Sequence, residues 1–158
     1  MIIVNFTKLN KEEKKLVNKA KLAAKNSVIN KNSFVGAVIL GAKGGIYKGA
    51  TIGRTRAIGS TCSERMALDQ LYFQGKEEPK IICTIGMFER FGWKNNFICT
   101  PCGVCLEMFF ESMKFFKISN LKFICSSWDK TKILKCTFEE LFPQIGKGQW
   151  QRNDSTTL

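Results

Sequence analysis

Histidine is absent from the 158 residues of the sequence. This absence excludes Ser–His–Asp triads, Cys–His nucleophile pairs and every zinc site that uses an imidazole ligand. Any proton transfer must therefore use Glu, Asp, Lys, Tyr or Cys. The sequence also lacks an uninterrupted apolar run near the ~20 residues that span a bilayer, and its N-terminus has no secretory-signal pattern. We therefore expect a cytoplasmic protein with no membrane partner.

Acidic residues are few, because 13 Asp and Glu stand against 25 Lys and Arg, which gives a formal net charge of +12. Only five of the basic residues are Arg, and bidentate recognition of phosphate or guanine favours Arg over Lys. The composition therefore favours a lysine-coated surface over a nucleic-acid groove. A nucleic-acid partner is an alternative that requires aromatic side chains among the basic ones. One cluster has this composition: Phe88, Arg90, Phe91, Trp93 and Lys94.

The length suits one compact domain. Hydrophobic residues make up 44% of the chain, and a chain near 150 residues can remove about 68–70% of its unfolded surface from water. We expect a single domain over residues 1–148, followed by a flexible tail over residues 149–158.

Hydrophobic patterns predict an alternation of helices and strands. Asn10 with Glu13, and Thr137 with Glu140, have the spacing of capping boxes at helix starts. The predicted helices lie at 11–25, 63–74 and 101–116, with a short one from 138. The predicted strands lie at 34–40, 46–52, 80–86, 121–126 and 132–136. This order predicts an α/β fold, a three-layer α/β/α sandwich with a mixed five-stranded sheet.

Seven cysteines in a chain without a visible signal sequence indicate a reducing compartment, where grouped cysteines more often bind metal than form disulfides. Cys83, Cys125 and Cys136 lie in apolar, strand-like runs and are predicted to behave as small hydrophobic residues. The other four are candidate ligands: Cys62, Cys99, Cys102 and Cys105.

Two short segments carry the chemistry, Cys62-Ser63-Glu64 and Pro101-Cys102-Gly103-Val104-Cys105. Each is expected at a helix N-terminus, where free N–H groups and the helix dipole stabilise a thiolate. Three thiolates and one open position suit tetrahedral, catalytic zinc. Zinc lowers the pKa of a bound water towards ~7, and Glu64 beside it can accept the water's proton.

Two other readings of the same residues are open. Thr61 and Glu64 have capping-box spacing, and Thr100-Pro101 is an ordinary helix start. Cys99 could also close a structural zinc site as a fourth ligand. A closed site has no use for a carboxylate beside the ion, so we favour the open, catalytic site.

From residue 10 to residue 143, the chain resembles the short, homotetrameric form of the cytidine deaminase family. The resemblance rests on C-x-E, 36 residues, then P-C-x-x-C, and on four further segments. These segments are Phe34-Val35-Gly36-Ala37-Val38, Gly44-Gly45-Ile46-Tyr47-Lys48-Gly49, Phe97-Ile98-Cys99-Thr100 and Glu139-Glu140-Leu141-Phe142-Pro143. It implies a Zn²⁺ cofactor held by Cys62, Cys102 and Cys105, catalytic acid–base work by Glu64, and a homotetramer. It also implies that Arg65 donates hydrogen bonds to the thiolates and offsets their charge.

The sugar-binding residues depart from the family. Its N-x-E motif falls on Thr51 and Gly53, and its base-facing aromatic residue falls on Ser33, one place before Phe34. Arg54 and Arg56 could instead meet a phosphate or another anionic group. The candidate substrate-binding residues are therefore Phe34, Thr51, Ser63, Arg54 and Arg56.

The resemblance implies zinc-dependent hydrolytic deamination of a cytosine nucleoside or a related 4-aminopyrimidine, with release of ammonia. A deaminase of the blasticidin-S type, acting on a modified cytosine nucleoside, is the alternative within the same chemistry. A nucleic-acid-binding or editing protein and a purely structural zinc module are the alternatives outside it.

Overall fold

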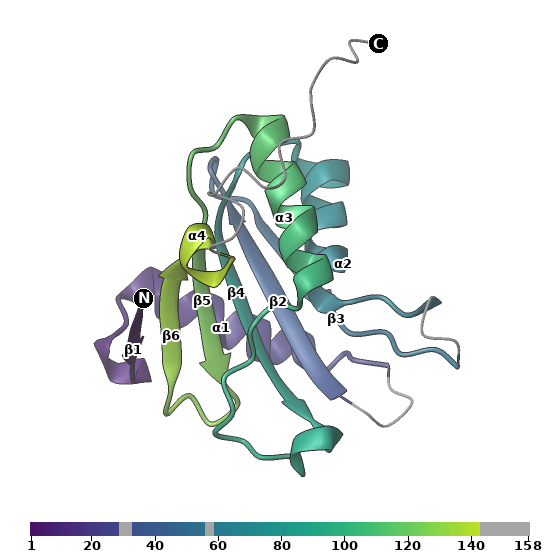
Figure 1. Ribbon diagram of the computed structural model, residues 1–158, viewed down its shortest axis with the longest axis vertical. Helices are drawn as coiled ribbons and strands as arrows, with labels where there is room; N and C mark the ends of the chain where they lie inside the picture. The colour runs from purple at the N-terminus through teal and green to yellow at the C-terminus, as the bar shows by residue number, and fades with distance from the viewer. Residues whose placement is uncertain (29–32, 56–58, 143–158) are drawn as a thin grey trace.

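The computed structural model describes residues 1–28, 33–55 and 59–142, which form one mixed sheet with helices on both faces (Figure 1). The strand order is β1-β6-β5-β4-β2-β3, and every neighbouring pair is antiparallel except the parallel pair β4 and β5. The strands are β1 (Ile2–Val4), β2 (Ser33–Gly41), β3 (Ile46–Ala50), β4 (Pro79–Phe88), β5 (Lys122–Ser127) and β6 (Ile133–Thr137). The helices are α1 (Lys11–Ala24), α2 (Ser63–Gln70), α3 (Gly103–Phe116) and α4 (Phe138–Leu141).

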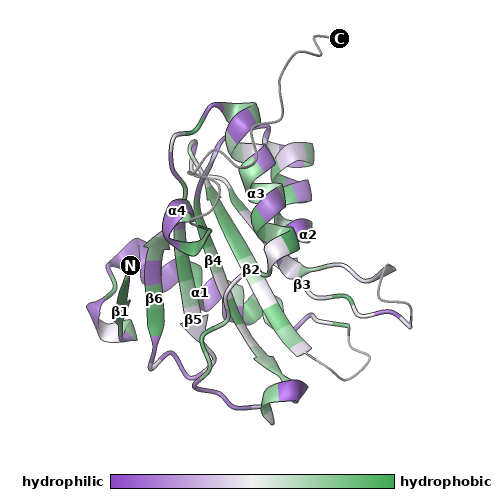
Figure 2. Cartoon of the chain, viewed as in Figure 1, coloured by the Kyte–Doolittle hydropathy of each residue, from purple (hydrophilic) through white to green (hydrophobic). Residues whose placement is uncertain are grey.

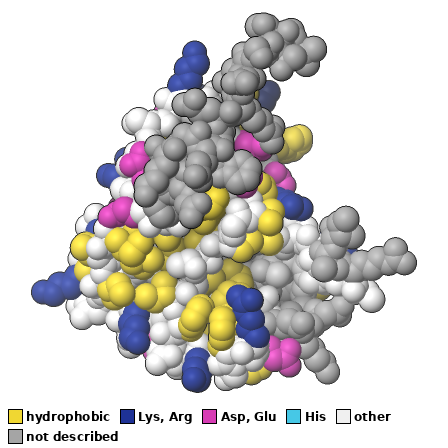
Figure 3. Space-filling view, in the orientation of Figure 1, with side chains coloured by type: hydrophobic (Ala, Val, Ile, Leu, Met, Phe, Trp, Pro, Cys, Tyr) yellow, Lys and Arg dark blue, Asp and Glu magenta, His cyan; other side chains and the backbone are white. Residues whose placement is uncertain are grey.

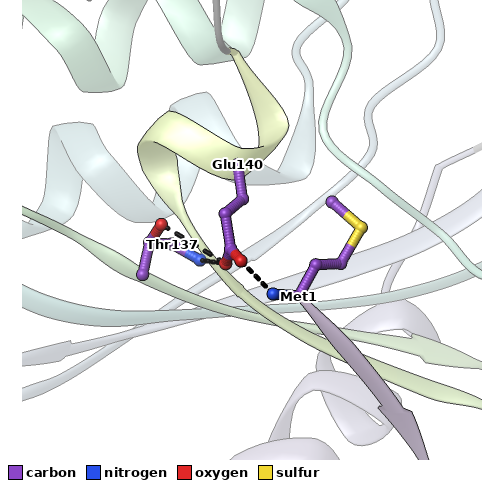
Figure 4. A network of polar contacts seen from close by, with 3 residues as sticks. All are labelled: Met1, Thr137 and Glu140. Carbon is purple, nitrogen blue, oxygen red and sulfur yellow. Dashed lines mark hydrogen bonds and ion pairs between the residues drawn. The ribbon is translucent and has the colours of Figure 1, made fainter.

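The predicted number of strands is wrong, because the sheet has six strands among the described residues rather than five. The additional strand, β1, pairs antiparallel with β6 and places Ile3 opposite Leu134. A strand of three residues is too short to show a period-two pattern, so the sequence does not predict it. Beside it, the Met1 ammonium contacts Glu140, whose other carboxylate oxygen accepts a 2.9 Å hydrogen bond from the Thr137 N–H (Figure 4).

Alternation along the strands divides the core into two layers. On β2, Val38 and Leu40 pack in one cluster with α1, whereas Ala37 and Ile39 pack in the other cluster with α2 and α3. The molecule is therefore a three-layer sandwich, with α1 on one face of the sheet and the other helices on the opposite face (Figure 1).

Hydropathy follows these layers: apolar residues fill the central strands, and polar residues are frequent on the outer sides of the helices (Figure 2). No helix within residues 1–28, 33–55 and 59–142 combines the length and the apolar character needed to cross a membrane.

Both predicted capping boxes are confirmed. Asn10 accepts a 2.9 Å hydrogen bond from the Glu13 N–H, and Glu13 accepts a 3.0 Å bond in return. Thr137 and Glu140 form the second box at the start of α4. These two helix ends are therefore set by local sequence, unlike the ends that carry the cysteines.

A buried carboxylate fastens the turn between β2 and β3 to the segment before β4. Glu77 is 5% exposed, and its Oε1 accepts a 2.5 Å hydrogen bond from the Tyr47 hydroxyl. Its Oε2 accepts from the Lys43 N–H. The bond to Glu77 raises the pKa of Tyr47, and burial adds to the effect. This carboxylate therefore has a structural role at the β2–β3 turn.

Candidate active site

Cys62 is placed by the end of β3. Ile52 and Thr61 form an antiparallel bridge with N–H···O distances of 3.0 and 2.9 Å, and Cys62 follows directly as the N-cap of α2. A Cβ atom on Gly49 would lie 1.9 Å from the Ser63 carbonyl oxygen. The first turn of α2 therefore packs directly against the backbone of β3, at a distance that only glycine permits.

Cys102 is the N-cap of α3, and Cys105 lies in the first turn of the same helix. Their Sγ atoms are 3.8 Å apart, and the three Sγ atoms of Cys62, Cys102 and Cys105 lie within 4.8 Å of one another. Neither α2 nor α3 has a side-chain cap, so sulfur occupies both N-cap positions. The predicted ligands thus converge from two helix N-termini.

The exposure of the three sulfur-bearing side chains differs. Cys105 is buried, Cys62 is half-buried and Cys102 is exposed. The cluster therefore has one side in the protein and one side open to solvent. An open side is what a catalytic metal needs for water or substrate in its fourth position.

The protein groups alone already favour a thiolate at Cys62. A hydrogen bond with Cys105 lowers the pKa of Cys62 to about 7, while burial and Glu64 oppose the shift. The same hydrogen bond, together with burial, raises the pKa of Cys105. Arg65 is half-buried and its charge also lowers the pKa of Cys62, although it makes no hydrogen bond or ion pair with the other described residues. Arg65 thus acts on the cluster by charge.

Glu64 is buried beside the sulfurs with 6% exposure, and its Oε2 accepts a 2.8 Å hydrogen bond from the Ser63 hydroxyl. Burial raises the pKa of Glu64, against hydrogen bonds that lower it. The capping box considered for Thr61 and Glu64 is not formed, because the N-cap is Cys62 and no side chain caps the helix. The Glu64 carboxylate is therefore free of a capping role.

Cys99 does not join the cluster of sulfurs. It is 1% exposed, its N–H donates to the Ser126 carbonyl at 3.3 Å, and its carbonyl accepts from the Thr84 hydroxyl at 2.5 Å. Burial raises the pKa of its thiol. The backbone thus ties Cys99 to β4 and β5, and a closed four-cysteine site is not assembled.

Two of the predicted substrate-binding residues, Thr51 and Phe34, have different positions relative to the cysteine cluster. The Thr51 N–H donates to the Val35 carbonyl at 3.0 Å, which holds Thr51 at the β3 end that leads to Cys62. Phe34 alternates along β2 with Gly36 and Val38 and so lies on the same face of the sheet, the face that α1 covers. The Phe34 ring packs on Trp93, with 5.6 Å between ring centroids. The structure therefore does not bring Phe34 to the thiolate cluster.

The structure describes only one of the two arginines predicted to bind an anionic group. Arg54 is exposed, and its guanidinium donates to the Gly59 carbonyl while its N–H donates to Ser60 Oγ at 3.0 Å. The backbone N–H of Arg54 and one N–H of its guanidinium are therefore used within the loop. Arg56 lies outside the described residues, as does the predicted tail over residues 149–158.

Two positions at the sheet side of the site were not singled out from the sequence. A Cβ on Gly86 would lie 2.9 Å from Val35 Cγ2 and 3.1 Å from Cys99 Sγ. Val35 shares the strand parity of Ala37, so this face is the one that carries α2 and α3. The period-two alternation of β2 indicates the face of the sheet on which Val35 lies. A close approach at a glycine such as Gly86 leaves no pattern in the local sequence.

The donor set fits zinc. Zn–S bonds of about 2.3 Å in a tetrahedron place two sulfurs about 3.8 Å apart, which matches the separation of Cys102 and Cys105. Soft thiolates select zinc over magnesium or calcium, which prefer oxygen ligands. Three thiolates with a buried acid beside an open position are the equipment of a hydrolytic zinc enzyme.

Comparison with known proteins specifies this class further. The family model of the cytidine and deoxycytidylate deaminase zinc-binding region matches residues 10–120. The chain belongs to this family. It is therefore a zinc-dependent hydrolytic deaminase of cytosine compounds, with Zn²⁺ as its cofactor.

Solved structures share the fold at low sequence identity. Cytidine deaminase from Burkholderia pseudomallei has a TM-score of 0.67 at 18% identity, and the match covers 84% of this chain and 96% of that one. The enzyme from Mycobacterium leprae has a TM-score of 0.63 at 18% identity, covering 85% and 100%. The enzyme from Bacillus anthracis has a TM-score of 0.59 at 19% identity, covering 84% and 88%. No curated protein sequence matches the chain.

Proposed function

We propose that Cys62, Cys102 and Cys105 hold the zinc ion and that Glu64 carries the protons of the deamination. The observation that supports this assignment is the convergence of three sulfurs within 4.8 Å of one another, with Glu64 buried two residues after one of them. Arg65 offsets part of the negative charge of three thiolates, in line with its effect on the pKa of Cys62.

In the proposed reaction, water adds its oxygen to C4 of the cytosine ring, the C4–N4 bond breaks, and the amine leaves as ammonia. The bound zinc supplies Lewis-acid activation of that water at neutral pH. Glu64 accepts one proton from the water and delivers it to ring N3. It then accepts the remaining proton of the oxygen added at C4 and passes it to the leaving amine. The Ser63 hydroxyl, at 2.8 Å from Glu64 Oε2, keeps the carboxylate in place for these transfers.

For the substrate, we propose a cytosine nucleoside that carries a further substituent or a phosphate group. Thr51 and Gly53 offer fewer hydrogen bonds to a ribose than the Asn and Glu of the family motif. Each lost neutral hydrogen bond costs roughly 0.5–1.5 kcal/mol. Arg54, which keeps free N–H groups, and Arg56 are available for an anionic group instead.

Ammonia release from purified zinc protein tests this proposal. We expect a substituted or phosphorylated cytosine compound to exceed cytidine in kcat/KM by about ten- to hundred-fold, because two sugar contacts are lost. The panel consists of cytidine, deoxycytidine, their monophosphates and blasticidin S. Arg54→Ala or Arg56→Ala should narrow the gap, with Lys122→Ala as the matched control. Equal turnover of cytidine and every other candidate, unchanged in both arginine variants, would refute the anionic assignment.

A modified nucleoside of the blasticidin S type is the second candidate, and the same altered sugar site supports it. The nucleic-acid alternative has less support. Phe88, Phe91 and Phe97 pack on one another at 4.2–6.2 Å between ring centroids, and Arg90 lies over Phe88 and Phe91. Rings that are occupied by each other offer fewer free faces for stacking bases.

We also propose that the chain forms a homo-oligomer, most simply a tetramer, in the cytoplasm. Aromatic side chains at the ends of α2 and α3 are exposed, with Phe73 at 86% and Phe115 at 71%. Tyr72 stacks on Phe116 at 5.8 Å between ring centroids and meets Phe115 edge-on at 6.0 Å, so Tyr72, Phe115 and Phe116 form one apolar patch. Contiguous exposed apolar surface marks an interaction site. All seven cysteines are unpaired, as a reducing compartment requires.

Light scattering measures the assembly. Four copies of a 17.9 kDa chain give a mass of about 72 kDa. Phe115→Ser should reduce this mass while leaving each chain folded, because the side chain is exposed in a single copy. Leu22→Ser on α1, also at an exposed apolar residue, is the control that should leave the mass unchanged. A monomer at every micromolar concentration of the parent protein would contradict the proposal.

A further inference from the structure

A groove separate from the zinc site runs along the free edge of the sheet. Strand β3 forms this edge, with α1 on one face of the sheet and α2 on the other (Figure 1). The groove has a volume of about 310 Å³. Its walls come from α1 (Lys19, Leu22, Ala23, Asn26), β3 (Lys48, Gly49, Ala50) and α2 (Met66, Gln70).

The polar side chains of the groove have no partners among the residues that the structure describes. The side chains of Lys19, Asn26, Lys48 and Gln70 make no hydrogen bond or ion pair with any other described residue. The Ala50 N–H, which points outward from the edge, reaches only the Met66 sulfur at 3.5 Å. No acidic side chain is among the described residues that line the groove. Two lysines and two amide side chains therefore line the groove with no carboxylate among the described lining residues.

Apolar groups form the floor between these donors. Leu22 is 59% exposed, and Ala23 and Met66 lie beside it. A pocket with an apolar floor and a few convergent polar groups is the usual form of a small-molecule site. A strand from another chain fits less well, because a lysine in the middle of an edge strand opposes extension of the sheet.

None of Cys62, Glu64, Cys102 and Cys105 is among the residues that line the groove. Ser63, Glu64 and Ala67 are buried, with Ala67 in the core cluster that includes α3 and Ser63 against β3. The groove takes Met66 and Gln70 from the same helix, one and two turns after Cys62. A molecule that contacts only the lining residues would therefore not touch the sulfur cluster.

We propose that this groove binds a small organic anion, a phosphate monoester or a carboxylate with an apolar body. Lys19 and Lys48 neutralise the anionic head, Asn26 and Gln70 donate to its oxygens, and the apolar body rests on Leu22 and Met66. The site has no part in the deamination itself.

Amide NMR spectra of the zinc-loaded protein test the proposal with phenyl phosphate and benzoate as probes, and benzyl alcohol as the uncharged control. We expect saturable shifts at Asn26, Ala50 and Gln70 with phenyl phosphate, benzoate or both, and the stronger probe identifies the head group. The variant K19Q/K48Q should weaken binding about tenfold or more, since both charge-assisted contacts are lost. The matched variant K80Q/K122Q, which removes two exposed lysines elsewhere, should keep the affinity within about twofold.

Four results would overturn the proposal. One is the absence of shifts at these amides with either anion at about 10 mM, a concentration that would detect even weak binding. Another is an equal response to benzyl alcohol, which would indicate apolar contact alone. The third is an unchanged affinity in K19Q/K48Q. Shifts confined to residues next to Cys62 and Cys102 would assign the anion to the zinc site and count against the groove as well.

Discussion

Replacement of Glu64 by Gln is expected to lower kcat about 10²–10⁴-fold while the protein stays folded and keeps its zinc, because the amide cannot accept and return a proton. The side chain is 6% exposed, and the amide has nearly the same shape as the carboxylate. Its oxygen can still accept from the Ser63 hydroxyl, which now donates at 2.8 Å. Single-turnover deamination and zinc content per chain, measured on the same sample, separate chemistry from metal loss.

The matched control is Glu77→Gln, since Glu77 is a carboxylate of similar burial at 5% exposure but fastens the β2–β3 turn. Weakening its hydrogen bond to Tyr47 should cost about 1–3 kcal/mol of unfolding free energy and leave kcat nearly unchanged. If the two variants lose activity equally, burial rather than position explains the effect. Retained turnover in Glu64→Gln would show that Glu64 takes no part in proton transfer.

The sequence predicts those parts of the fold that depend on local patterns. The capping boxes at Asn10 and Thr137 are confirmed because both partners of each box lie within one turn of helix. The five longer strands were predicted from apolar runs, with boundaries within a few residues of those observed. Strand β1 could not be predicted in the same way, because its three residues form a strand through pairing with β6.

The candidate site was predictable in part for a related reason. Spacing on the helices places Cys102 beside Cys105, and the resemblance to a known family supplies Cys62 from a second helix. By contrast, the contacts of Phe34 and Arg54 depend on neighbours distant in sequence or on loop geometry, Trp93 for one and the Gly59 carbonyl for the other. Strand parity indicates the face of a residue but not its partner.

Gly49 shows the same limit of prediction from the sequence. In the sequence it is one glycine within an otherwise ordinary strand, and such a glycine indicates only a bulge or a close approach. In the structure it allows the Ser63 carbonyl to approach so closely that a Cβ there would lie 1.9 Å from the oxygen. The position of Cys62 relative to the sheet therefore depends on a residue that has no side chain with which to bind a metal.

Two cysteines only three residues apart are expected to respond in opposite ways to replacement by serine. Cys102→Ser should remove most of the bound zinc and abolish deamination, because a neutral hydroxyl is a much weaker zinc ligand than a thiolate. Its fold should survive, since Cys102 is exposed and serine is a favoured residue at the N-cap position that it occupies. Cys99→Ser should keep one zinc per chain and lose about 1–3 kcal/mol of unfolding free energy, because the change buries a hydroxyl.

Zinc content after dialysis against a weak chelator, together with X-ray absorption at the zinc edge, decides between the open and the closed site. The open site gives three sulfur neighbours and one lighter atom in both the parent protein and Cys99→Ser. A closed site would give four sulfurs in the parent and three in Cys99→Ser, with no position left for water. The Cys99 backbone is hydrogen-bonded to Thr84 and Ser126 at 2.5 and 3.3 Å, and its sulfur lies outside the group that the other three sulfurs form, so a closed site would require Cys99 to move.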